Sequence, residues 1–208
     1  MRRYLLVVAA ALVGLPGAAE ALEVRAAERA KEGNAQIFGI PVDSLSAGLG
    51  YGNWTGEAAP DIAPGFGWNV ALDLDATRPV DLEVRYQGNV NSIAASGLEE
   101  FNIYNNQIAA SAQVQPVRVG EVEPFVSGGI GLARASLAKN PDLNTEFQSD
   151  TMGVIPLAAG AQYDLTDNLV LGAHAHLDVL FDNEILTQEE TTDSDRWGIM
   201  INLGATNF

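Results

Sequence analysis

The sequence predicts an all-β fold, an eight-stranded antiparallel up-and-down barrel that spans a membrane. Three observations predict it. Apolar and polar side chains alternate with a period of two over most of the chain, which is the periodicity of a strand. The alternating segments are joined by long and short links in turn. The clearest segments are also longer than a typical soluble strand, which has about 5 to 6 residues.

The hairpin from residue 155 to residue 181 shows the pattern best. Its arms, 155–165 and 169–181, flank the tight turn Thr166-Asp167-Asn168, and in the second arm every odd position is apolar. A strand of ~11 residues, rising ~3.3 Å per residue and tilted by ~40°, climbs roughly 28 Å, close to the ~25 Å apolar band of an outer-membrane barrel. The apolar face is therefore expected to meet lipid, and the polar face an interior.

Residues 1–21 are predicted to be a signal peptide. Arg2 and Arg3 provide a positive start, residues 4–15 are apolar, and Ala19-Glu20-Ala21 offers small residues for cleavage. The apolar run is shorter than the ~20 residues of a membrane helix, so an uncleaved anchor is the less favoured alternative. Residues 22–42 are expected to form a periplasmic lead-in, because charges interleave with alanines there. The barrel is then assigned to residues 43–208.

The first three strands are expected at 43–54, 66–75 and 80–87. In the second and third, charges recur at every second position, with no stripe at the three- and four-residue spacing of a helix. A charge on the lipid-facing side near the midplane costs up to ~2–4 kcal/mol, so these charges are expected to point inward.

The remaining strands are expected at 101–114, 123–134, 155–165, 169–181 and from residue 196 to the terminus. Four long connections alternate with three short ones, as an up-and-down barrel with both termini in the periplasm requires. The long connections are 55–65, 88–100, 136–150 and 182–195, and the short ones are 76–79, 115–122 and 166–168. An even number of strands lets the barrel close without a bare edge in lipid.

The chain resembles the small outer-membrane barrels of the OmpA/OmpX and opacity-protein type. The resemblance is carried by the glycine-rich segment 123–131, the turn segment 159–168 and the final Phe208, and it covers about residues 43–208. It implies location in the outer membrane of a Gram-negative bacterium and a C-terminal aromatic residue that the barrel-insertion machinery recognises. Phe208 is out of step with the apolar positions of the last strand, so a bulge at Gly204-Ala205 is expected to restore the alternation.

The inward-facing charges predict an ionic network in the lumen. Its members are Asp73, Asp75, Asp81, Glu83, Arg85, Arg134, Asp164, His174, His176 and Asp178. Because side chains just fill an eight-stranded barrel, we expect a packed core in which Arg85 and Arg134 bridge acids from neighbouring strands. A narrow cation-preferring path is the alternative, since acids outnumber arginines in this set.

The segment 169–181 carries the residues that catalysis or metal binding would use. His174, His176 and Asp178 share one face with a spacing that permits a metal but does not demand one. Lipid-modifying enzymes among similar small barrels use a His-x-Ser pair, and here His176 stands in place of the serine. Ser111 and Ser127 are expected to face inward, but nothing in the sequence places either beside a histidine. No catalytic residue, metal or cofactor is therefore assigned.

The composition excludes some classes of partner and of chemical site. A net charge of −16 argues against a nucleic-acid partner, and the lack of cysteine excludes disulfides and thiolate sites. We expect a non-enzymatic structural or surface-exposed barrel whose loops serve recognition or adhesion, with aromatic girdles that include Trp54. The expected partners are outer-membrane lipid, lipopolysaccharide bridged by divalent cations to the acidic loop 182–195, the insertion machinery, and host or surface ligands. An outer-membrane lipid-modifying enzyme and a soluble ligand-carrying barrel are the alternatives.

Overall fold

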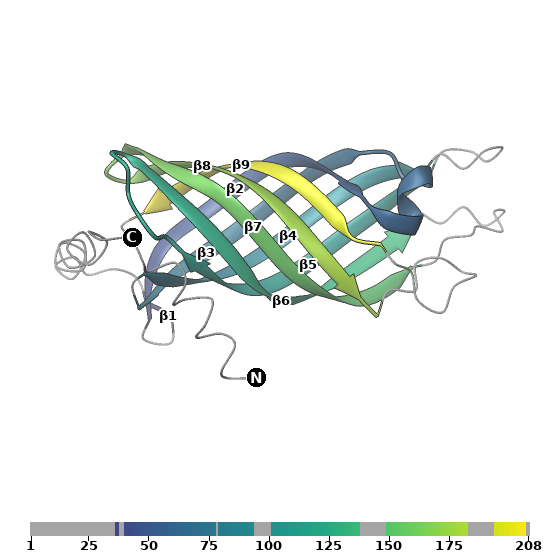
Figure 1. The fold of residues 1–208 in the computed structure, drawn as a ribbon, viewed down its shortest axis with the longest axis horizontal. Coiled ribbons are helices and arrows are strands. Elements are labelled where there is room, and N and C mark those ends of the chain that lie inside the picture. The colour runs from purple at the N-terminus through teal and green to yellow at the C-terminus, as the bar shows by residue number, and fades with distance from the viewer. Residues whose placement is uncertain are drawn as a thin grey trace.

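The computed structural model describes residues 36–37, 40–77, 79–93, 101–137, 149–182 and 194–206. Figure 1 shows a closed barrel of tilted strands. Each strand pairs with its neighbour in sequence, all pairings are antiparallel, and β2 pairs with β9 to close the ring. The predicted fold class is confirmed. In the described part of the chain, no helix is long and apolar enough to cross a membrane.

The barrel wall consists of β2 to β9, and β1 is a two-residue strand that pairs with the start of β2. The elements are β1 (Gln36–Ile37), β2 (Ile40–Trp54), η1 (Gly56–Asp61), β3 (Gly65–Thr77), β4 (Val80–Ile93), β5 (Phe101–Val114), β6 (Val122–Leu137), β7 (Asp150–Thr166), β8 (Leu169–Phe181) and β9 (Arg196–Thr206). The strand count and the order of the elements agree with the sequence analysis. Five strands extend beyond the predicted bounds, above all β4 and β7, whereas β5 and β8 match them at both ends.

The long and short connections lie at opposite ends of the barrel. The turns that join β3 to β4, β5 to β6 and β7 to β8 lie at one end, at the left of Figure 1. The opposite ends of these strands lie at the right, where η1 follows β2. We call these the short-turn end and the long-loop end. Most of the acidic loop 182–195 and the segments 94–100 and 138–148 lie outside the described residues.

The outer surface of the barrel is apolar. Each strand from β2 to β9 exposes large apolar side chains, such as Leu49 at 61%, Ile130 at 64% and Ile201 at 62% exposure. The alternate positions on the same strands are buried and mostly polar. This is the inside-out pattern of a barrel that presents its apolar face to lipid and its polar face to the lumen.

The lumen is apolar at the long-loop end, which the sequence analysis did not predict. A buried cluster forms there, which we call the apolar plug: Trp54, Ile62, Ile93, Ile103, Ala133, Ala135, Met152 and Val154. Trp54 is 1% exposed and points inward, so its assignment to an interface girdle was wrong. It lies on the inward parity of β2, together with the buried Ser44 and Gly52.

Two expectations concern the ends of the chain. The predicted signal peptide and most of the predicted lead-in lie outside the described residues, although β2 already begins at Ile40. The expected bulge at Gly204-Ala205 is not found, because β9 pairs with β2 and β8 without a register shift through both residues. The register shifts of the wall lie instead in β2, β3 and β7, close to the short turns.

Candidate functional site in the barrel interior

The first interior contact group centres on Arg85, from β4. Its Nη2 donates to Glu83 Oε2 at 2.6 Å, and its Nη1 lies 3.1 Å from Nε2 of His174, which reaches in from β8. A guanidinium has donors only, so His174 accepts this hydrogen bond through an unprotonated Nε2. All three residues are at least nine-tenths buried. The group therefore fastens opposite walls of the barrel to each other.

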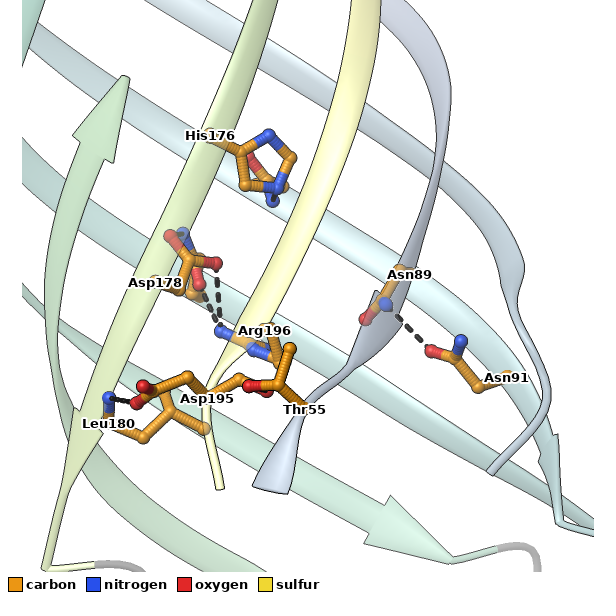
Figure 2. Close-up of polar contacts among 10 residues, drawn as sticks. Thr55, Asn89, Asn91, His176, Asp178, Leu180, Asp195 and Arg196 are labelled. Carbon is orange, nitrogen blue, oxygen red and sulfur yellow. Dashed lines mark hydrogen bonds and ion pairs between the residues drawn. The ribbon is translucent and has the colours of Figure 1, made fainter. Parts of the chain in front are cut away.

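The second group centres on Arg196, at the start of β9. Figure 2 shows Arg196 and Asp178 pointing toward each other from neighbouring strands, with Nη2 3.3 Å from Oδ2. Arg196 also donates to Gln107 Oε1, and Gln107 Nε2 donates to the other oxygen of Asp178 at 3.3 Å. The guanidinium lies 5.7 Å from the ring centroid of Trp54. Arg196 thus joins the polar interior to the apolar plug.

His176 lies between these groups. Its Nε2 is 3.0 Å from Gln87 Nε2, and its ring centroid is 5.9 Å from that of His174. Asp178, the third member of the His-x-His-x-Asp pattern, is engaged by Arg196 and Gln107. Within the described ranges, no three His, Cys, Asp or Glu side chains come together as a group that could hold a metal ion.

A cavity of about 400 Å³, part of it open to solvent, occupies the short-turn end of the lumen. Asp73, Arg85, Gln113 and His174 are among its lining residues. Asp73 Oδ2 accepts a hydrogen bond from the Ser44 hydroxyl at 2.5 Å. The other oxygen of Asp73, Gln113 Nε2 and Arg85 Nε are buried without a protein partner. The cavity is therefore polar, with both donors and acceptors on its wall.

Asp164 belongs to the rim rather than to the interior. It is half-buried at the short-turn end of β7 and forms an ion pair with Arg118, from the link between β5 and β6. Arg118 also lies 3.3 Å from Glu123 Oε1. The Arg118 side chain is 34% exposed, so solvent screens these pairs and their contribution to stability is small.

Arg134 corrects the sequence analysis, which placed it in the lumen. Its neighbours Ala133 and Ala135 are 2% and 1% exposed and point inward, so Arg134 points outward, where it is exposed. Ile130 and Leu132 face outward at even-numbered positions of β6, and Arg134 lies at the next even-numbered position.

The other predicted lumen residues divide by depth. Asp73, Asp81, Glu83, Arg85, His174, His176 and Asp178 are buried. Asp75 is half-buried and forms no hydrogen bond or ion pair with the described residues. It lies within the register shift of β3 between Leu74 and Thr77, next to two consecutive buried residues, Asp73 and Leu74, where the alternation breaks.

Arg196 is the interior residue that the sequence analysis missed. The signal was available, because Arg196 shares the even parity of Gly198 and Met200, opposite to the lipid-facing Trp197. Arg196 directly follows the acidic loop 182–195, so it stands at the end of the alternating segment rather than within it. Arg118 and Ser44 were missed for a similar reason, since both lie at strand ends or links rather than inside an alternating segment.

A second cavity, of about 260 Å³, lies near the Arg196 group and is lined by Gln87, His176, Asp178 and Met200 among others. From the short-turn end toward the long-loop end, the lumen therefore contains a polar cavity, the two arginine groups with the second cavity, and the apolar plug. Chemically, the arrangement offers two buried ion pairs, a polar cavity and an apolar barrier at one end.

Comparison with protein families assigns the chain to a family. The family model described as "Outer membrane protein beta-barrel domain" matches residues 7–205, almost the whole chain. The chain belongs to this family. Family membership and the apolar exterior place the protein in the outer membrane of a Gram-negative bacterium, and they rule out the soluble ligand-carrying barrel. None of the curated proteins compared with the chain matches it.

Solved structures with the same fold are small outer-membrane barrels. Neisserial surface protein A (NspA) is 18% identical, with a TM-score of 0.62 over 79% of this chain and 96% of that one. OprG from Pseudomonas aeruginosa is 12% identical, with a TM-score of 0.54 over 82% and 98%. Ail, the attachment invasion locus protein of Yersinia pestis, is 14% identical, with a TM-score of 0.50 over 78% and 97%. At these identities the likeness concerns the fold.

Proposed function

We propose that the protein is a closed, non-conducting surface barrel that presents its long loops outside the cell, where any recognition or adhesion takes place. The observation that carries this proposal is the apolar plug. Trp54, Ile93, Ile103, Met152 and Val154 are each at most 1% exposed, and they converge on the long-loop end of the lumen. Ions cross a narrow apolar constriction poorly, because no polar group there replaces their hydration shell.

The paired charges below the plug support the same proposal. Arg85 and Arg196 each contact a carboxylate within the lumen, so Glu83 and Asp178, two of the acids that a cation path would need, are already engaged. The narrow cation-preferring path therefore has little support from the contacts. The buried part of the predicted lumen network is then a structural core, in which charges hold the walls together.

The loop bases are held firmly, as a recognition surface requires. Asp195, where the fourth loop returns to β9, accepts hydrogen bonds from the Leu180 N–H through Oδ1 at 3.0 Å and from the Thr55 N–H through its carbonyl at 2.8 Å (Figure 2). Ile62, from the first loop, packs into the plug. Thr55 and Asp195, at the bases of the first and fourth loops, are thus fastened to each other and to the barrel.

An enzyme has less support. A serine nucleophile needs a base within hydrogen-bond distance. His174 Nε2 is instead occupied by Arg85, and neither Ser111 nor Ser127 forms a hydrogen bond with either histidine. Ail, one of the barrels with a similar fold, is the attachment invasion locus protein of Yersinia pestis, which agrees with a role in adhesion without assigning a ligand.

The test is a conductance measurement on the purified barrel in planar lipid bilayers. We expect no ohmic current steps from the wild type. The matched variant carries Ile93→Ala, Ile103→Ala and Met152→Ala together, which thins the plug while leaving every lumen charge in place. Regular current steps from the wild type that the triple variant does not change would overturn the proposal, because the plug would then not be the barrier.

A further inference from the structure

Arg134 stands apart from the other arginines that the structure describes. Arg85, Arg118 and Arg196 each contact a carboxylate, whereas Arg134 contacts none among the described residues and is exposed on the outer wall of the barrel. It lies near the long-loop end of β6, directly above the lipid-facing Leu132 and Ile130, which are 62% and 64% exposed. A cation on this face is costly at the bilayer midplane, and the cost falls steeply toward the interface.

Polar side chains surround Arg134 on the neighbouring strands. The register places Asn106 of β5 and Thr151 of β7 directly beside it, and Tyr104 opposite Ser136 one step farther toward the loops. These five residues share the outward face, and we call them the β5–β7 polar patch: Tyr104, Asn106, Arg134, Ser136 and Thr151. Figure 1 shows the three strands running side by side.

The patch is rich in hydrogen-bond donors and has no acid. The Tyr86 hydroxyl donates to Asn106 Oδ1 at 2.8 Å, so the amide group of Asn106 keeps its N–H donors for another partner. No outward position of β5, β6 or β7 in the described ranges carries Asp or Glu. Asp150 precedes Thr151 but has the inward parity, and its Oδ1 accepts the Thr151 N–H at 2.6 Å.

We propose that the β5–β7 polar patch binds a phosphate group of lipopolysaccharide in the outer leaflet, with Arg134 as the main contact. The long loops of such barrels face outward, so the patch lies at the level of the outer-leaflet headgroups. The phosphates of lipid A lie at that level and match a lone guanidinium in charge and in geometry, because Arg binds phosphate through two parallel hydrogen bonds. The hydroxyl and amide donors beside it complete a phosphate-binding surface. This inference depends on the outer-membrane location and not on the closed lumen.

The test compares binding of phosphorylated and dephosphorylated lipid A to the purified full-length protein in detergent, by native mass spectrometry in the presence of EDTA. The chelator removes any bridging through divalent cations. We expect the wild type to prefer the phosphorylated lipid by roughly tenfold, the size of one charge-assisted hydrogen-bonding contact. Arg134→Gln should lose this preference, and Arg134→Lys should keep part of it.

The matched control is Arg118→Gln, which removes the same charge from the short-turn end. It should keep the wild-type preference, and unboiled gel mobility should confirm that each variant is folded. An equal preference in wild type and Arg134→Gln would overturn the proposal. So would a loss of preference in both Arg134→Gln and Arg118→Gln, which would indicate a general charge effect. Full displacement of the lipid by millimolar inorganic phosphate would overturn the lipid as the ligand.

Discussion

Asp178 illustrates how far the interior depends on single residues. The Asp178 side chain is 1% exposed, and its carboxylate contacts Arg196 of β9 and Gln107 of β5. Replacing Arg196→Met would leave that charge with one neutral donor. We expect a loss of about 3–5 kcal/mol in the free energy of unfolding, the usual cost of breaking one side of a buried ion pair. Urea-induced unfolding of the barrel in lipid vesicles would measure it.

The double variant Asp178→Leu with Arg196→Met is the control for this prediction. It removes both charges at once, and replacing a buried pair by apolar side chains is often neutral. We expect it to recover most of the stability that Arg196→Met loses. If the double variant is as unstable as the single one, the loss comes from packing around Arg196 and not from the stranded carboxylate.

The two arginines also show what the sequence could predict at the residue scale. The period of two places Arg196 inside and Arg134 outside, and both placements agree with the structure. The expected lumen network placed Arg134 inside, against the period. An outward charge is costly at the midplane, whereas Arg134 lies near the rim. Contacts between strands, such as Arg85 with His174, could not be predicted because they depend on the barrel's register.

At the element scale, β6 shows how the inner and outer faces differ. Gly128 faces outward, where an added Cβ would meet Leu157 Cδ2 at 3.3 Å, a tight contact that a small shift of this side-chain end relieves. Gly129 faces inward, where an added Cβ would lie 2.6 Å from the Cα of Ser111 on β5. We expect Gly129→Ala to destabilise the barrel by about 1–3 kcal/mol, because backbone must move. Gly128→Ala should change stability by less than about 1 kcal/mol. Urea unfolding of both variants checks the pair, and similar losses in the two would contradict it.

Strand ends were harder to predict than strand centres. β4 extends to Ile93 and β7 begins at Asp150, both within predicted loops. In these extensions the inward positions carry the apolar plug residues Ile93, Met152 and Val154, while outward positions include Ser92 and Thr151. The polarity of the two faces is thus inverted near the long-loop end. The pattern of apolar residues on the outer face, from which the strands were predicted, is therefore absent at these strand ends.

At the scale of the whole molecule, closure was predictable and the plug was not. The even strand count and the alternation of long and short connections sufficed to predict a closed ring, as β2 pairing with β9 shows. The plug combines inward residues from five strands with Ile62 from a loop. None of these residues stands out in its own segment, and only the closed ring brings them together.

Closure should make the barrel resist denaturation as a unit, so that the folded form persists in SDS and migrates differently before and after boiling. Ile201 of β9 lies at the closing seam, opposite Leu49 of β2 on one side and Ala173 of β8 on the other. We expect Ile201→Pro to abolish the mobility shift, because proline removes a ladder donor inside a central strand. Ile201→Ala removes the same lipid-facing side chain, 62% exposed, but keeps the N–H, and should retain the shift. If both variants lose the shift, the lipid contact of Ile201 matters more than the ladder. If both retain it, the seam between β2 and β9 is not what makes the barrel resistant.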